Sequence, residues 1–88
     1  MDIDQAASRV LNRRLCRAAG QLHGVIGMLE AGRDCEAMLT QLAAVSHAVH
    51  RAAYLAVADQ LRQCALTRTG DDRAATIAEV EQTFLALG

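Results

Sequence analysis

The chain has 88 residues, is rich in alanine and carries few large side chains. Hydrophobic residues make up 52% of it, 18 residues are alanine, and Pro, Trp and Lys do not occur. A chain this short rarely stabilises a single core alone, and one built mainly of Ala and Leu lacks the bulky side chains that would help most. The composition therefore argues against a β-sheet and against a self-sufficient monomeric enzyme. We expect one all-α domain over residues 1–88 that completes its core against other copies of itself.

Charge is nearly balanced in total but unevenly distributed along the chain. Nine arginines oppose ten acidic residues, which gives a net charge of −1. No acid lies between Gln5 and Leu29. The arginines of that stretch are Arg9, Arg13, Arg14 and Arg17. A basic stripe that is repeated in an oligomer can bind phosphates even though the net charge of the protein is negative. The alternative interpretation is a helix face that is exposed to solvent and keeps the protein soluble.

The sequence also bears on where the protein acts. No apolar run approaches the ~18 residues of a membrane span. The acidic N-terminal residues lack the apolar region of a signal peptide, so we expect a cytoplasmic protein with no membrane partner. In that compartment we expect Cys16, Cys35 and Cys64 to be thiols, metal ligands or redox sensors rather than structural disulfides.

Hydrophobic periodicity predicts a first helix over about residues 4–30. Six apolar residues follow a 4-3-4-3-4 spacing, which is the a/d pattern of packed helices. They are Leu11, Leu15, Ala18, Leu22, Val25 and Leu29. We expect Gly32 to end this helix in the left-handed C-cap position.

A second, longer helix is predicted from Asp34, a good N-cap residue, to about residues 67–70. The 4-3-4-3-4 spacing recurs at Met38, Leu42, Val45, Val49, Ala52 and Ala56. A second apolar row contains Leu39, Val57, Leu61 and Cys64. Two apolar rows indicate a helix buried on two sides, and a length of roughly 33 residues is typical of a bundle core.

A third, short helix is predicted to open with Asp71 and Asp72 as its caps. Its apolar residues at helical spacing are Ile77, Val80, Phe84 and Leu87. A helix of this length is unstable alone in water, so we expect it to dock on the rest of the chain.

Cys35 and Cys64 both fall on the second predicted helix, 29 positions apart. At the rise of an α-helix this is about 43 Å, so the two thiols cannot share a metal or a disulfide within one straight helix. If two copies pair antiparallel about the midpoint between Val49 and His50, Cys35 of each chain lies opposite Cys64 of the other, as a twofold interface allows. Thiolates at these positions would be nucleophiles or soft-metal ligands. From the residues alone, an equally good interpretation is that both cysteines are small buried side chains without a chemical role.

The other candidate residues carry weaker signals. Cys16 has no partner cysteine at a suitable spacing, and we interpret it as incidental. His47 and His50 have a spacing that can bind metal, but His47 is already ~18 Å from Cys35 along the helix, so an exposed or interface role is favoured. His23 is expected on the surface. No catalytic constellation, phosphate-binding loop or pair of carboxylates converges at a usable spacing, and we do not expect an enzyme.

Six blocks of sequence closely resemble the CsoR/RcnR family of bacterial transcriptional repressors. These blocks, which span nearly the whole chain, are Arg14-Leu15, Gly20-Gln21, Gly32-Arg33-Asp34-Cys35, Thr40-Gln41-Leu42-Ala43-Ala44-Val45, Arg51-Ala52 and Leu61-Arg62-Gln63-Cys64. The resemblance implies an all-helical dimer of dimers without a helix-turn-helix. In it the long second helices pair antiparallel in a four-helix-bundle-like core, and an inducer binds between subunits.

The resemblance also implies a function and site residues. By the resemblance, Arg14 and Arg51 match positions that contact operator DNA. Arg17 is a further candidate contact, which rests only on its place in the basic stripe. Copper sensors of the family carry Cys, His and Cys, with the histidine four residues before the second cysteine. Here Cys35 and Cys64 match the two thiols, but Gln60 occupies the histidine position.

Two thiols without the histidine resemble the CstR-like branch of the family. Members of that branch sense persulfide and polysulfide by linking the two thiols across the dimer. The resemblance therefore implies a homotetrameric repressor that reactive sulfur releases from DNA and that needs no cofactor. Two alternatives stay open: a repressor that binds Cu(I) through Cys35 and Cys64, and a helical interaction module that binds no DNA.

Overall fold

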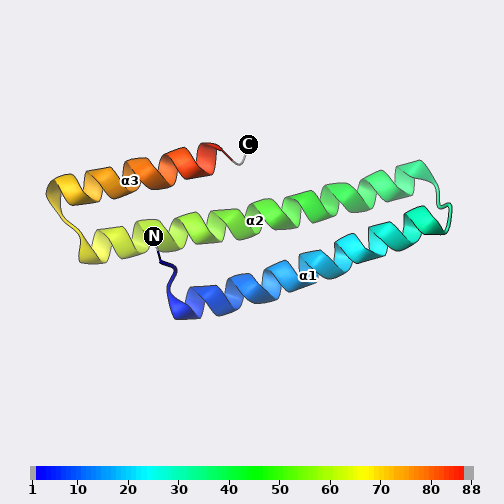
Figure 1. Ribbon diagram of the computed structural model, residues 1–88, viewed down its shortest axis with the longest axis horizontal. Helices are drawn as coiled ribbons and strands as arrows, with labels where there is room; N and C mark the ends of the chain where they lie inside the picture. The colour runs from blue at the N-terminus through cyan, green and yellow to red at the C-terminus, as the bar shows by residue number, and fades with distance from the viewer. Residues whose placement is uncertain (1, 87–88) are drawn as a thin grey trace.

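The computed structural model describes residues 2–86 and consists of three α-helices (Figure 1). Helix α1 spans Gln5–Glu30, α2 spans Cys35–Thr67 and α3 spans Gly70–Leu85. No strand occurs among the described residues. The predicted all-α, three-helix fold is confirmed, while Leu87, expected on the third helix, lies outside the described residues.

Aspartate side chains cap the first two helices. One carboxylate oxygen of Asp4 accepts hydrogen bonds from the backbone N–H groups of Ala6 and Ala7, at 3.2 and 3.4 Å. Asp34, the predicted N-cap of the long helix, accepts a hydrogen bond from the N–H of Ala37 at 3.3 Å. Each cap satisfies N–H groups that have no partner inside the helix.

Gly32 ends α1 in the way that the sequence predicts. Its φ is 68°, in the left-handed region that a side chain disfavours. The N–H of Arg33 donates to the carbonyl of Met28 at 2.9 Å, and the N–H of Gly32 donates to that of Leu29 at 3.1 Å. This pair of hydrogen bonds is the Schellman motif, and it turns the chain so that α2 can return along α1.

The start of α3 differs from the prediction. Asp71 and Asp72 are not its caps: the helix begins at Gly70, Thr69 occupies the N-cap position, and no side chain makes a cap hydrogen bond. Gly70 has a φ of 57°, so a glycine-dependent turn rather than an aspartate sets the boundary. The two aspartates lie in the first turn of α3, where their negative charges interact favourably with the positive end of the helix dipole.

Helix α2 is central and contacts both other helices, whereas α1 and α3 do not contact each other. Helix α1 runs antiparallel along α2, and α3 folds back along the C-terminal half of α2 (Figure 1). The molecule measures 56 × 24 × 13 Å, and its radius of gyration is 16.9 Å. A compact domain of this length has a radius of gyration of about 12 Å, so a single chain is thin and extended.

The predicted apolar stripes are only partly buried in one chain. Its buried apolar residues are Ala18, Val25, Val45, Ala52, Cys64 and Val80. Leu29 and Leu39, by contrast, are 62% and 56% exposed. The accessible surface is 6464 Å², whereas a compact monomer of 9.4 kDa exposes about 5,000 Å². The chain leaves much of its apolar surface uncovered.

Within residues 2–86, none of the helices combines the length and the apolarity needed to cross a membrane.

Replacing Gly32 with Ala should lower the free energy of unfolding by about 1–2 kcal/mol, because a Cβ disfavours the left-handed conformation. A Cβ there would meet no other atom within 4 Å, so the loss comes from the backbone alone. Gly32→Asn should lower the free energy of unfolding by less than Gly32→Ala, since asparagine adopts the left-handed conformation more readily than alanine. Urea unfolding followed by circular dichroism measures both variants, and an Ala variant as stable as the wild type would contradict this role of Gly32.

Candidate functional site

The two cysteines of the predicted sensing pair lie at opposite ends of α2. Cys35 is the first residue of the helix and is exposed, whereas Cys64 lies one turn before its end and is 2% exposed. Helix α2 runs between them without a break (Figure 1). The thiols are therefore about 43 Å apart along the helix axis, and they do not meet within one chain.

Cys64 lies against the first turns of α3, beside a polar hollow. Its thiol donates a weak hydrogen bond to the carbonyl oxygen of Arg73 at 3.5 Å. The residues that line the hollow are Asp2, Gln60, Gln63, Cys64, Thr67, Arg68 and Thr76. Cys64 thus borders this hollow, although only 2% of the residue is exposed.

Arg73 and Arg68 hold α3 over this end of α2. The Nε of Arg73 donates to the carbonyl of Arg68 at 2.9 Å, and its Nη2 donates to that of Ala65 at 3.0 Å. The guanidinium of Arg68 in turn donates to the hydroxyl of Thr76. The bond to Ala65 satisfies a carbonyl in the last turn of α2 that lacks a partner inside the helix. Together the three bonds fix the helix that covers Cys64.

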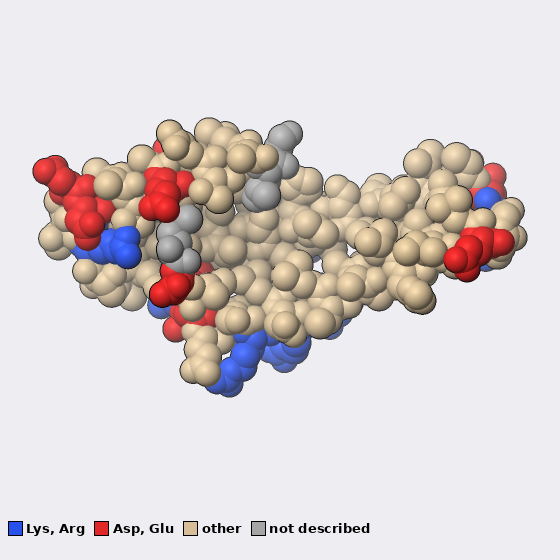
Figure 2. Space-filling model, viewed as in Figure 1, with Lys and Arg blue, Asp and Glu red and all other residues tan. Residues whose placement is uncertain are grey.

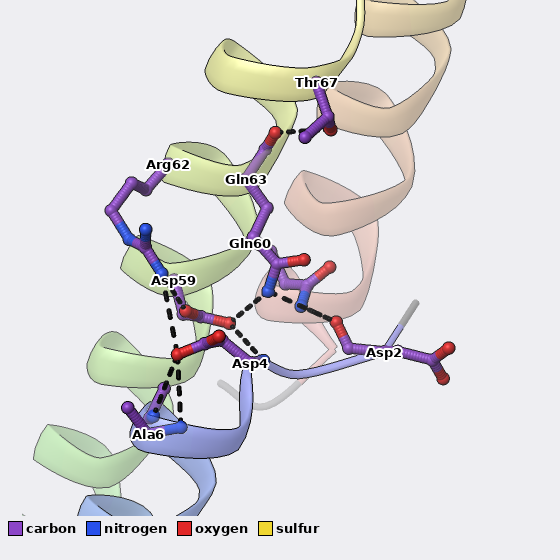
Figure 3. A network of polar contacts seen from close by, with 9 residues as sticks. Asp2, Asp4, Ala6, Asp59, Gln60, Arg62, Gln63 and Thr67 are labelled. Carbon is purple, nitrogen blue, oxygen red and sulfur yellow. Dashed lines mark hydrogen bonds and ion pairs between the residues drawn. The ribbon is translucent and has the colours of Figure 1, made fainter.

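Gln60, one turn before Cys64, binds the segment that precedes α1. Its Nε2 donates to the carbonyl oxygen of Asp2 at 2.6 Å, and the Nε2 of Gln63 approaches the same oxygen at 3.4 Å (Figure 3). Two amide side chains thus hold the start of the chain beside the hollow. The side chain of Gln60 serves as a hydrogen-bond donor to the backbone.

The buried carboxylate of Asp59 fastens the same segment. Asp59 is 6% exposed and accepts hydrogen bonds from the backbone N–H of Asp4 at 3.2 Å, from Arg62 at 2.9 Å and from Gln63 at 2.7 Å (Figure 3). Burial alone would raise the pKa of Asp59, but these hydrogen bonds and the charge of Arg62 outweigh it and lower the pKa below the ordinary aspartate value. Asp59 therefore holds the N-terminal segment as a carboxylate.

Arg14 and Arg17 of α1 and Arg51 of α2 line a single hollow between the two helices. All three are exposed, and none forms an ion pair with a described residue. Figure 2 shows basic side chains along the free edge of α1, whereas the acidic side chains lie mainly toward the two ends of the molecule. The three arginines that the sequence predicts as DNA contacts are thus brought together, and we name their hollow the basic hollow.

Two further polar residues, Gln21 and His47, line the basic hollow. Its remaining lining residues are Ala18, Ala44 and Ala48. Neither polar residue is among the predicted DNA contacts, although its spacing from a predicted arginine could have indicated this position. Gln21 lies four residues after Arg17, and His47 lies four residues before Arg51. Each pair shares one face of its helix.

The other residues singled out in the sequence line neither hollow. Cys16 is exposed, and its thiol approaches the side-chain oxygen of Asn12 at 3.6 Å. His23 is exposed, as predicted. The ring of His50 lies 3.0 Å from the carbonyl oxygen of Ser46, and this residue does not line the basic hollow.

A single chain offers no ready metal site. Within residues 2–86, no three His, Cys, Asp or Glu side chains lie close enough together to hold a metal ion. Cys35 and Cys64 from two different chains would provide two sulfur ligands, which suit the soft ion Cu(I). The amide of Gln60 provides no soft third ligand beside them.

Residues 7–86 match the family of metal-sensitive transcriptional repressors. The chain belongs to this family. The match covers nearly all of the three helices and bears out the resemblance to CsoR/RcnR-type proteins that the six sequence blocks indicate. It places the protein among repressors of transcription, which implies binding to DNA, rather than among enzymes. A comparison with curated proteins gives no significant match.

Replacing Asp59 with Asn should destabilise the protein at pH 7 by about 1–3 kcal/mol, because the donors from Arg62, Gln63 and the backbone of Asp4 lose their buried, charged acceptor. The folded-state pKa of Asp59 is lowered, so its contribution is present above the unfolded pKa of about 3.9. That contribution is lost as the pH falls through the lower, folded value.

The difference in unfolding free energy between wild type and Asp59→Asn should therefore shrink as the pH falls from 7 to 3. Chemical denaturation at several pH values measures it. Glu81→Gln, at an exposed position without an ion pair to a described residue, is the control and should follow the wild type. Two parallel pH profiles for wild type and Asp59→Asn would contradict the assignment.

Proposed function

We propose that the protein is a cytoplasmic, homotetrameric repressor of the CstR-like branch of its family. In the reduced state it binds operator DNA through Arg14, Arg17 and Arg51. Reactive sulfur species link Cys35 of one subunit to Cys64 of its neighbour and release the DNA. The observation that carries this proposal is the position of the two thiols at opposite ends of one uninterrupted helix, where only a second chain can bring them together.

Exposed apolar side chains support the antiparallel dimer. On α2, Leu39 and Leu61 of the second apolar row are both exposed in the single chain. Pairing two α2 helices about the point between Val49 and His50 would cover this row and set each Cys35 opposite the neighbour's Cys64. The surface in excess of a compact monomer, over 1,000 Å² per chain by the scaling of compact proteins, is more than the ~800 Å² that each partner buries in a standard interface.

The covalent step needs only the polysulfide as oxidant. The Cys35 thiolate attacks a terminal or an inner sulfur of the polysulfide, a shorter hydropolysulfide or hydrosulfide leaves, and Cys35 carries a persulfide or a longer sulfur chain. The neighbour's Cys64 thiolate then attacks a sulfur of that chain and displaces hydrosulfide, which leaves a di-, tri- or tetrasulfide bridge. The two thiolates lose two electrons in total, and the sulfur atoms that leave accept them.

A sulfur bridge also suits the unequal exposure of the two thiols. The exposed Cys35 is the one that meets the polysulfide, and the covered Cys64 resolves the adduct from its hollow. A direct disulfide requires Cα atoms about 4.4–6.8 Å apart, and each inserted sulfur lengthens the bridge by an S–S bond of about 2 Å. A polysulfide can therefore join thiols that are too far apart to form a disulfide without movement of the helices.

Gln60 favours reactive sulfur over copper as the inducer. In the copper sensors that the chain resembles, this position carries the third ligand. Here its side chain binds the backbone of Asp2, and an amide is a poor ligand for Cu(I), which prefers thiolates and imidazole. A Cu(I) repressor that uses the two thiolates alone is the second candidate, supported by the metal-sensitive family to which the chain belongs.

Treatment of the reduced protein with polysulfide should produce a cross-linked dimer on a non-reducing gel. Mass spectrometry should find Cys35 joined to Cys64 of another chain with zero to two additional sulfur atoms. Cys35→Ala and Cys64→Ala should each abolish the cross-link, whereas Cys16→Ala should retain it. A protein that stays monomeric on the gel, or a cross-link that depends on Cys16, would contradict the proposal.

Competition with a Cu(I) chelator separates the two inducers. The sulfur proposal expects weak Cu(I) binding that leaves the DNA complex intact. Tight, stoichiometric binding that releases DNA and is lost in Cys35→Ala would favour the copper alternative instead.

Arg14→Ala and Arg51→Ala should each weaken binding to DNA from upstream of the protein's own gene and reduce the salt dependence of binding, because each removes phosphate contacts. We expect a loss of about tenfold or more per variant in an electrophoretic mobility-shift assay. Arg33→Ala, outside the basic hollow, is the control and should bind like the wild type. Unchanged DNA binding in both hollow variants would contradict this assignment, and a wild type that does not bind the DNA would favour an interaction module.

A further inference from the structure

The basic hollow contains a histidine that the proposed DNA contacts do not include. His47 of α2 lines the same hollow as Arg14 and Arg17 of α1 and Arg51 of α2. The two histidines of α2 differ in this respect, because His50 does not line the hollow and its ring instead lies 3.0 Å from the carbonyl oxygen of Ser46.

The lining of the basic hollow suits a phosphate group. Its charged residues are three arginines, and no carboxylate is among its lining residues. The neighbouring parts of α1 and α2 add no negative charge, since no acid occurs between Gln5 and Leu29 or between Ala37 and Ala58. Alanine side chains complete the lining and, being short, leave room between the two helices for an anion. Guanidinium groups bind phosphate through paired N–H donors.

We infer that His47 is a further DNA contact that binds a backbone phosphate in the basic hollow together with Arg14 and Arg51. We infer also that it makes DNA affinity depend on pH. This inference rests on the proposed function. Histidine is the side chain whose charge ordinarily changes between about pH 5 and 8, and a doubly protonated imidazole donates from both nitrogens.

The pH dependence follows from the groups around His47. The charged residues that face the hollow are Arg14 and Arg17 from α1 and Arg51 from α2. Helix α3 does not contact α1 and adds no residue to the lining of the hollow. A bound phosphate is thus the negative charge that favours the protonated imidazole, so proton binding and DNA binding strengthen each other. Affinity should rise as the pH falls from 8 to 6.

The test measures the DNA affinity of the reduced protein at pH 6.0, 7.0 and 8.0 by fluorescence anisotropy at constant ionic strength. The probe is a labelled duplex from upstream of the protein's own gene, with a scrambled duplex of equal length for comparison. The wild type should bind about tenfold more tightly at pH 6.0 than at pH 8.0, the effect of one charge-assisted hydrogen bond. His47→Gln, which cannot take up a proton, should lose most of this dependence.

Two further variants separate a phosphate contact from a structural role. His50→Gln is the matched control on the same helix and should retain the full pH dependence. His47→Arg carries a fixed charge and should bind as tightly at pH 8.0 as the wild type does at pH 6.0. Circular dichroism should show the same helical content in all of these variants.

The outcomes distinguish this inference from the proposed function. If the wild type binds the duplex and Arg51→Ala weakens binding, but His47→Gln keeps the wild-type pH dependence, the proposed function stands and the role of His47 is overturned. If His50→Gln loses the pH dependence instead, the inference is overturned in the same way. A wild type that binds neither duplex at any pH overturns the proposed function and this inference with it.

Discussion

The structure depends on one constraint: a single chain cannot cover its own apolar surface. Helix α2 is packed on one side by α1 along its length, but α3 reaches only its C-terminal half (Figure 1). The side chains that pack within the chain are mostly small, and Leu29 and Leu39 stay largely exposed. Hydrophobic burial is the main favourable term in folding and association, so the uncovered face drives the association of chains that we propose.

The same constraint connects the fold to the proposed sensing mechanism. A long α2 separates Cys35 from Cys64 by the length of the helix, so any chemistry that joins them must take place across an interface between chains. Arg14 and Arg51 lie on α1 and α2, in a hollow whose shape depends on how these two helices pack. A sulfur bridge at the ends of α2 would alter helix packing and thereby the spacing of these arginines, which is a coupling between two distinct sites.

Much of the fold could be predicted from the sequence, because local signals determine it. Spaced apolar residues, the Asp34 cap and Gly32 define the first two helices and the turn between them, and the structure agrees. The start of α3 was predicted wrongly because two aspartates resemble caps, while the deciding feature is the positive φ of Gly70. Propensity alone did not reveal that conformation.

The sites were predictable in part. The cysteines and arginines stand out by residue type and position, and the structure gathers the three arginines in one hollow. The roles of Asp59 and Gln60 were not visible, because both bind residues more than fifty positions away in the sequence. The only signal for Asp59 was that no other acid occurs between Ala37 and Thr67. Contacts of this kind depend on tertiary packing, which periodicity does not describe.

The central claim is that Cys35 and Cys64 meet between chains and not within one. Mixing two variants tests it directly, one carrying Cys35→Ala and the other Cys64→Ala, both with Cys16→Ala, followed by treatment with polysulfide. We predict no cross-link in either variant alone, and in the mixture a dimer in which Cys35 of one variant is joined to Cys64 of the other. A cross-link between identical variants, or none in a mixture shown by native mass spectrometry to contain mixed dimers, would contradict it.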